Sequence, residues 1–146
     1  MCIRDSLKAA PDGGAVEELA RSGFEDVTVR CVRASYRTRL VEPGQPVLLW
    51  VSGADERHPP GIHAAGWTTG VVRHSADGPV MPVRLRAVRP YVPRSALLAD
   101  PSLAGVEVLR FAAGSNPSYL DAEQYAALRA AFPQVDHRDR PGPGTA

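Results

Sequence analysis

The apolar and polar positions of this chain follow the pattern of short strands through most of its middle. An unbroken apolar run, V-L-L-W-V, lies inside Pro46–Ser52 and predicts a strand covered on both faces. Apolar positions alternate with arginines over Met81–Val92, which predicts a strand with an arginine-lined outer face and a change of phase near Ala87. Two more stretches, Asp26–Val32 and Gly61–Val72, also have strand-like patterns.

Helical patterns are fewer and shorter. An acidic start and a glycine stop predict a short helix over Asp12–Gly23. A helical turn is expected over Pro93–Leu98 and a last short strand over Val106–Phe111. The clearest helix is Asp121–Phe132, because its first residue can cap it and Gln124 follows three positions later, as in a capping box.

Together these elements are typical of the α+β class, and we predict a small β-barrel with short flanking helices and a C-terminal helix. The 146 residues suit one domain, which we assign to residues 7–133. The opening letters M-C-I-R-D-S match no element and resemble a translated adapter, so we expect a non-native leader at residues 1–6. The charged, Pro- and Gly-rich residues 134–146 are expected to form a mobile tail.

Charge is distributed unevenly along the chain. The formal net charge is +1, but the stretch from Thr28 to Arg94 has ten arginines and four acids, or +6, against −3 before it and −2 after it. A basic domain between acidic flanks is expected where one face meets phosphates. The alternative is that the arginines are solvated and scattered, as in proteins from GC-rich genomes.

Several classes of protein are disfavoured. Cys2 and Cys31 form no disulfide framework, so we expect a reduced, cytoplasmic setting. No apolar run approaches the roughly eighteen residues that cross a bilayer. The chain lacks a nucleophile-elbow motif and a glycine-rich phosphate loop, and His58, His63 and His74 lack the spacing of a metal site. We therefore expect no enzyme, no metal and no cofactor.

Recognition of a nucleobase requires flat side chains, donors and acceptors for the base edge, and cations for the backbone. The aromatic candidates for stacking, worth about 1–3 kcal/mol per base, are Tyr36, Trp50 and Trp67. The polar candidates for the base edge are Ser35, Thr38, Ser52 and Asn116. The cationic candidates for phosphates are Arg33, Arg37 and Arg39.

Each candidate also has a purely structural interpretation. Trp50 ends an apolar run, as core residues do, and Tyr36 can simply hold a turn. Arg39 can pair with Glu42 at the surface, which contributes little. Asn116 can be no more than part of a loop before the last helix.

The order of six segments resembles the EVE family, small domains with a PUA-like fold that are implicated in recognising modified bases. The segments are Leu7–Pro11, Ser35–Thr38, Pro43–Gln45, Leu49–Gly53, Pro60–Gly66 and the stretch from Val108 to Leu120. The resemblance implies that Lys8 and Pro11 flank a pocket and that Ser35–Thr38 lines it. It also implies that most of the family's first strand is missing here.

From this resemblance we expect a non-enzymatic domain, monomeric, that binds modified DNA or RNA. The base would enter a pocket between the Ser35–Thr38 turn, the strand end Trp50–Ser52 and the loop at Asn116. Two alternatives remain open. The domain can bind a free modified nucleoside, or it can bind a protein through the arginine-bearing strand Met81–Val92 in a defence or toxin-type system.

Overall fold

The computed structural model of the protein describes residues 4–9, 23–25, 29–31, 39–51, 59–76, 78–106, 109 and 118–136. Its strands are β1 (Arg4–Ala9), β2 (Val29–Cys31), β3 (Pro46–Val51), β4 (Gly61–Thr68), β5 (Arg73–Ser75), β6 (Gly78–Pro93) and β7 (Ser118–Leu120). Its helices are α2 (Arg94–Ala99), α4 (Ala122–Ala131) and a 3-10 turn at Pro133–Val135.

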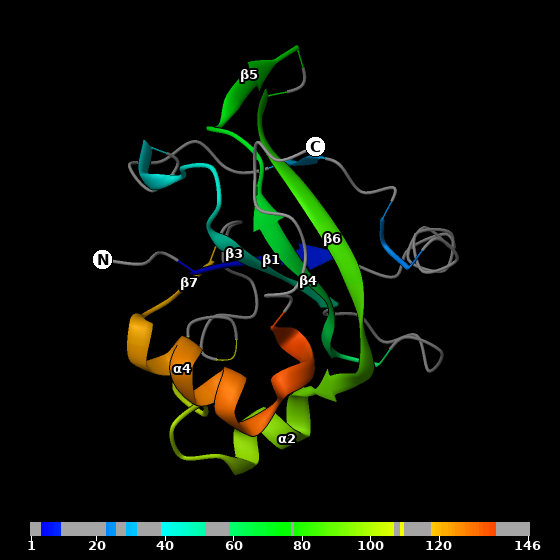
Figure 1. Ribbon diagram of the computed structural model, residues 1–146, viewed down its shortest axis with the longest axis vertical. Coiled ribbons are helices and arrows are strands. Elements are labelled where there is room, and N and C mark those ends of the chain that lie inside the picture. Colours follow the sequence, from blue (N-terminus) through cyan, green and yellow to red (C-terminus); the bar gives the residue numbers. More distant parts are fainter. Residues whose placement is uncertain are drawn as a thin grey trace.

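The described strands form one curled, seven-stranded sheet in the order β2-β6-β4-β3-β1-β7, with β5 paired to β6. All pairs are antiparallel except β1 with β3. Figure 1 shows β6 running the length of the molecule, with α2 and α4 at one end and the β5 hairpin at the other. The α+β class is therefore confirmed, but among the described strands the sheet is a half-barrel with edges at β2 and β7 rather than a closed barrel.

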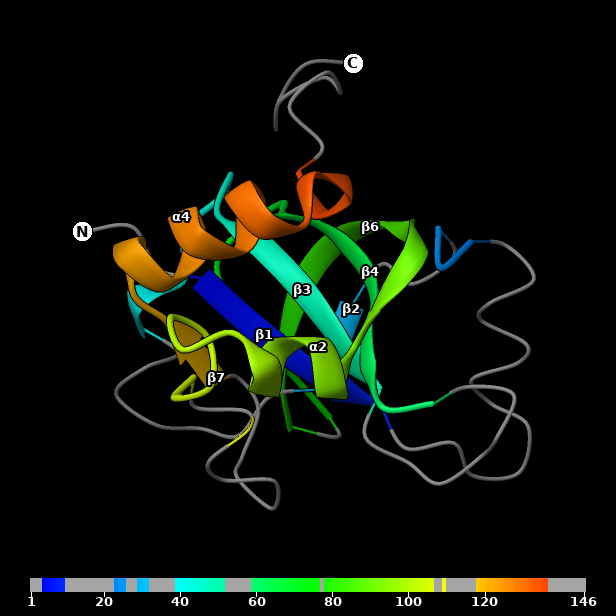
Figure 2. The same ribbon diagram turned by 90° about the horizontal axis from the view of Figure 1, so that it is seen from below.

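Strand β3 is covered on both faces, as its unbroken apolar run predicted. Val47, Leu49 and Val51 belong to one group of buried side chains, called here the strand cluster, with Phe24, Val41, Ala64, Met81, Val83 and Leu85. Leu48 and Trp50 point the other way, into a group that α2 and α4 cover and that we call the helix-side cluster. Figure 2 shows β1 and β3 side by side, with both helices packed near them.

Two glycines let β4 and β6 approach closely. A Cβ on Gly66 would lie 1.7 Å from the carbonyl oxygen of Arg84, and a Cβ on Gly61 would lie 2.2 Å from that of Val92. Gly61 also has a φ of +157°. No other residue fits at either position without separating the strands.

A hydrogen-bonded corner connects the start of β3 to the end of β4. Gly44, with a φ of +88°, donates its N–H to the carbonyl oxygen of Thr68 at 2.8 Å. The fully buried Thr68 hydroxyl accepts from the N–H of Gln45 at 2.9 Å and donates to the carbonyl oxygen of Glu42. The Gln45 side chain donates to the carbonyl oxygen of Leu40 at 3.1 Å, which fixes the turn that enters the corner.

Helix α4 begins as its sequence predicted. Asp121 and Gln124 form a complete capping box, with each side chain bonded to the other's backbone N–H at 2.7 and 3.0 Å. Tyr125 and Leu128 are buried against the sheet. The helical turn predicted near Pro93 is α2, whereas the strand predicted at Val106–Phe111 is wrong at Leu109, which is helical and donates its N–H to the carbonyl oxygen of Val106.

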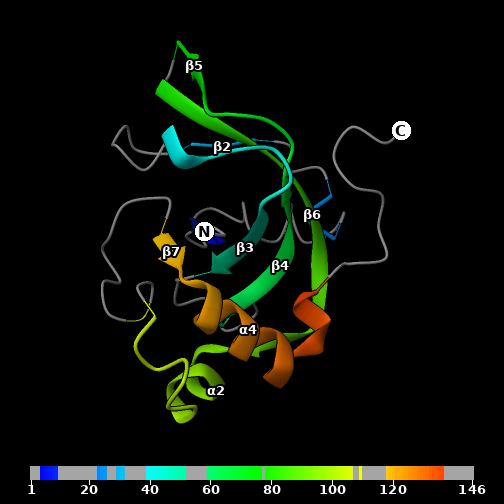
Figure 3. The same ribbon diagram turned by 60° about the vertical axis from the view of Figure 1, so that its left-hand side comes forward.

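The first strand is more complete than the sequence indicated. β1 has six residues, and Asp5–Ala9 pair in register with Val47–Val51. Residues 4–6, which we assigned to a non-native leader, form its first half and pair with β7. Figure 3 shows β7 leading directly into α4. The inferred foreign origin of this leader stays a prediction.

The packed domain also extends past residue 133. Val135 is 2% exposed and belongs to the helix-side cluster. The Gln134 side chain donates to the carbonyl oxygen of Pro90 at 3.2 Å, and Arg129 lies 3.8 Å from Asp136. The boundary of the domain therefore moves from 133 to at least 136. The helix predicted over Asp12–Gly23 lies outside the described residues, apart from Gly23 in a turn.

Candidate nucleic-acid interface

Several candidate residues follow strand ends that meet at one end of the sheet. Ala9 of β1 pairs with Val51 of β3, which pairs with Gly61 of β4. The candidates Pro11, Ser52 and Asn116 lie outside the described residues, but their flanking strands are described. Pro11 lies two positions beyond Ala9, Ser52 follows Val51 directly, and Asn116 lies two positions before β7, which runs antiparallel to β1.

Lys8 belongs to the same end of the sheet. Its backbone lies in β1 opposite Trp50 of β3. The described neighbours of Pro11 and Ser52, Ala9 and Val51, therefore lie side by side with Lys8 at the end where β1 and β3 finish, whereas Ser118, after Asn116, lies opposite Ser6. We call this end the pocket end.

The described neighbours of Ser35, Tyr36, Arg37 and Thr38 lie elsewhere. These four candidates fall outside the described residues, between Cys31 of β2 and Arg39. Cys31 pairs with Val80 near the start of β6, and Arg39 leads into the corner at Gly44 and Thr68. Cys31 and Arg39 therefore lie toward the opposite end of the sheet from Ala9 and Val51. A pocket that includes both Ser35–Thr38 and Ser52 would require the residues between Cys31 and Arg39 to extend along the sheet toward Val51.

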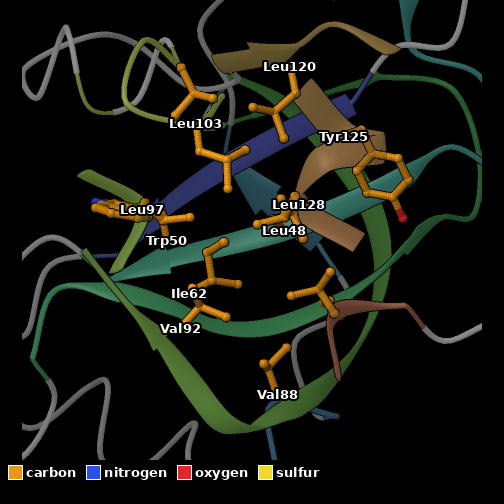
Figure 4. Close-up of a cluster of buried hydrophobic side chains, with 13 residues drawn as sticks. Leu48, Trp50, Ile62, Val88, Val92, Leu97, Leu103, Leu120, Tyr125 and Leu128 are labelled. Atoms are coloured by element: carbon orange, nitrogen blue, oxygen red, sulfur yellow. The ribbon is translucent and has the colours of Figure 1, made fainter. Parts of the chain in front are cut away.

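Trp50 is a core residue. Its side chain is 3% exposed and lies in the helix-side cluster with Leu48, Leu97 and Leu128 (Figure 4). The same apolar residues line a cavity of about 20 Å³, which has room for roughly one water molecule and none for a base. Trp50 is therefore part of the core, and its ring has no exposed face on which a base could stack.

Trp67 is also buried, at 5% exposure, although it lies outside both clusters. It pairs with Pro46 of β3 and with Arg84 of β6. Neither tryptophan is therefore available to stack on a nucleobase in this conformation. Of the three aromatic candidates, only Tyr36 keeps that role as a prediction.

The arginine-lined face of β6 appears as its pattern predicted. Met81, Val83 and Leu85 enter the strand cluster, so the exposed Arg84 and Arg86 lie on the opposite face. Arg86 has a loose contact of 3.9 Å with Glu25, and both side chains are at least half exposed. Such a surface pair contributes little to stability and leaves the cation accessible.

The β5 hairpin continues this basic surface. Arg73, His74 and Ser75 are all exposed, and Arg73 pairs with Val80 of β6. Val80, Arg84 and Arg86 are separated by even numbers of residues along β6, which pairs regularly with β2 over Val80–Pro82 and with β4 over Val83–Ala87, so Arg73 falls on the same face. The sequence analysis assigned only the β6 arginines to a contact surface. It did not include Arg73, because the sequence pattern does not show that β5 pairs with β6.

His63 stacks on Tyr91 where the register of β4 and β6 shifts, between Ile62 and Ala64. The His63 and Tyr91 rings are 4.6 Å apart at an angle of 18°, and His63 Nε2 lies 2.7 Å from the carbonyl oxygen of Pro59.

In the described part of the chain, no group of three or more His, Cys, Asp or Glu side chains could hold a metal ion. No helix within that part is long and apolar enough to span a membrane.

Comparisons with known proteins give the fold and little beyond it. No protein-family model matches the chain, and no curated protein sequence matches it. Solved structures match over almost the whole chain at low identity. Human THYN1, solved in complex with 5-methylcytosine-containing DNA, is 14% identical with a TM-score of 0.62, covering 89% of this chain and 97% of that one.

Two bacterial structures are equally similar. Atu2648 from Agrobacterium tumefaciens is 11% identical with a TM-score of 0.66, covering 99% of this chain and all of its own. Rpa0253 from Rhodopseudomonas palustris is 11% identical with a TM-score of 0.65, covering 94% and 97%. The chain therefore shares the α+β fold of these proteins, in agreement with the PUA-like architecture that its motifs implied.

Proposed function

We propose that this chain is a member of the EVE family and a non-enzymatic, nucleic-acid-binding domain that recognises a modified base. The observation that supports this most is the fold shared along nearly the full length with human THYN1, whose structure contains 5-methylcytosine DNA. The basic face of β5 and β6 supports it independently. In this proposal the curled sheet closes into a PUA-like barrel, and the domain works as a cytoplasmic monomer.

The proposed mechanism is extrusion of the modified base from its stack into a pocket. Unstacking costs a few kcal/mol, which contacts within the pocket must offset. Tyr36 is the proposed stacking ring. Ser35, Thr38, Ser52 and Asn116 are proposed to address the base edge, with Lys8 and Pro11 at the rim and Arg37 on a phosphate.

The two tryptophans take a different role in this proposal. Trp50 lies two positions before Ser52, and its buried ring is proposed to fix the end of β3 that leads to this residue. Trp67 supports the other end of the sheet, next to the corner of Gly44 and Thr68. Both contribute to recognition through the scaffold and not through stacking.

Binding to matched oligonucleotides tests the proposal. The experiment is fluorescence anisotropy of labelled single- and double-stranded DNA and RNA, carrying either 5-methylcytosine or cytosine at one position. A methyl group buried in a fitted pocket contributes about 1–3 kcal/mol, so we expect roughly tenfold or tighter binding of the modified strand. Equal affinity for a full panel of modified and plain strands would rule the proposal out.

A pair of variants at Tyr36 tests the stacking role. Tyr36→Ala should lose about 1–3 kcal/mol of binding, whereas Tyr36→Phe keeps the ring and should bind nearly as well as the unchanged protein. If both variants bind normally, Tyr36 does not contact the base.

A further inference from the structure

The exposed face of β5 and β6 has a geometry suited to a nucleic-acid backbone. Arg84 and Arg86 are alternate residues of one strand, so their Cα atoms are about 6.6–6.8 Å apart. That is about twice the ~3.4 Å axial spacing of phosphates along one strand of DNA. Arg73 extends the line by the distance from Val80 to Arg84, about 13 Å along the strand.

The three arginines have few competing partners. Among the described residues, the one acid within ion-pair distance of any of them is Glu25, 3.9 Å from Arg86. The other described acids lie in β1, on the corner before β3 and around α2 and α4: Asp5, Glu42, Asp100, Asp121, Glu123 and Asp136. Within the described part of the chain, the row therefore has three cations against the one loosely paired carboxylate of Glu25.

The core covers part of this face of β6. Val88 and Val92 lie on the same side of the strand and are buried in the helix-side cluster. Arg84 and Arg86 precede these two residues along β6, on the side toward β5. Figure 1 shows β5 at the end of β6 that is away from α2 and α4. A long ligand can therefore lie along the row without displacing α2 or α4.

We propose that Arg73, Arg84 and Arg86 form a phosphate-binding row that holds the backbone of the nucleic acid and sets its position over the domain. This inference rests on the proposed function, because the ligand is the same molecule, but it concerns the backbone and not the base. Contacts to phosphates position a protein without reading sequence. The row therefore contributes affinity equally to modified and plain strands.

The test is the salt dependence of binding to a labelled oligonucleotide duplex. Each phosphate contact contributes about 0.9 to the slope of log K against log salt. The double variant Arg84→Ala/Arg86→Ala should lower the slope by about 1.8. Between 50 and 200 mM salt, the fall in affinity would then be about twelvefold smaller than for the unchanged protein. Adding Arg73→Ala should lower the slope by about 0.9 more.

Two controls separate position from net charge. Ala126→Glu/Ala130→Glu changes the net charge by the same two units on the exposed face of α4, away from the row. At physiological salt a charge acts over about 8 Å, so this variant should keep the original slope. Arg84→Lys/Arg86→Lys keeps the charges and should keep most of the slope.

The outcomes for the two proposals are distinct. The row is supported if Arg84→Ala/Arg86→Ala lowers the salt slope and the α4 control does not. The ratio of the affinities for modified and plain strands should stay unchanged in the arginine variant. An unchanged slope, or an equal fall in the α4 control, overturns the row, even where the unchanged protein prefers the modified base. Equal binding of both strands with an arginine-dependent slope overturns base recognition and leaves the row standing. Failure to bind any oligonucleotide overturns both and favours an acidic protein as the partner of this face.

Discussion

Strands β3 and β6 belong to the same sheet but are covered differently. Both faces of β3 are buried, one in the strand cluster and one in the helix-side cluster. β6 buries Met81, Val83 and Leu85 on one face and exposes Arg84 and Arg86 on the other. The comparison teaches that β3 serves the stability of the fold, whereas the arginine-bearing part of β6 exposes side chains that a partner can contact.

The same contrast separates the candidate residues. Trp50 lies on β3, where a large ring fills the core. The arginines lie on β6 and β5, where removing a side chain exposes no cavity. Substitutions on the two strands should therefore affect different measurements: unfolding for β3 and its contacts, and binding for β6.

The largest effect is expected where the inner sheet meets β6. Gly66→Ala places a Cβ 1.7 Å from the carbonyl oxygen of Arg84, so β4 and β6 must separate. We expect a loss of at least about 5 kcal/mol, comparable to the whole stability of a small domain. Circular dichroism and urea unfolding measure it. Gly105→Ala is the control, since no atom lies within 4 Å of the added carbon. Normal stability of the Gly66 variant would contradict the close approach of the strands.

The next largest effect concerns Trp50. Trp50→Ala removes a ring that is 3% exposed, and we expect a loss of about 3–5 kcal/mol in the free energy of unfolding. Trp50→Phe should retain most of the packing. In the folded Phe variant, affinity for a modified oligonucleotide should stay within about twofold, because the ring does not stack on the base. A loss of binding without loss of stability would place Trp50 in the pocket after all.

A smaller loss is expected at the corner before β3. Thr68→Val keeps the shape of the buried side chain but leaves the N–H of Gln45 and the carbonyl oxygen of Glu42 without their partner. Such unpaired groups cost about 1–3 kcal/mol, measured by urea unfolding. Thr68→Ser keeps the hydroxyl and should lose less. Equal stability of the valine and unchanged proteins would show that water replaces these bonds.

The smallest effect on stability is expected at the arginine row. Arg84→Ala/Arg86→Ala should change the free energy of unfolding by less than about 0.5 kcal/mol per site, since both side chains are exposed and Arg86 has only a loose contact of 3.9 Å with Glu25 among the described acids. A thermal melt compared with the unchanged protein measures this. A loss above about 2 kcal/mol would assign the row to the fold and remove the contrast between the two strands.

Local patterns in the sequence predicted the elements that depend on local chemistry. The run V-L-L-W-V gave β3 its two buried faces, and Asp121 with Gln124 gave α4 its start. The alternation of arginines gave the exposed face of β6. In each case the period or the cap acts within a few residues, so no distant contact was needed.

What depends on distant contacts was not predictable in this way. The parallel pairing of Asp5–Ala9 with Val47–Val51 joins residues about forty positions apart, and a six-residue strand alone gives no sign of its partner. The burial of Trp67 depends on what covers the sheet, not on its neighbours in the sequence. For the candidate pocket, sequence order suggested one group of residues, but the register puts the flanks of Ser35–Thr38 toward the other end of the sheet from Ser52.

A competition experiment tests most directly the claim that this domain recognises a modified base within a nucleic acid. A labelled duplex with one 5-methylcytosine is bound to the unchanged protein and displaced with unlabelled modified duplex, plain duplex of the same sequence, or free 5-methylcytidine. We predict that the modified duplex displaces the label at the lowest concentration, the plain duplex at roughly tenfold more, and the nucleoside at a higher concentration still, because it lacks phosphates. Displacement at one common concentration by both duplexes would contradict the account.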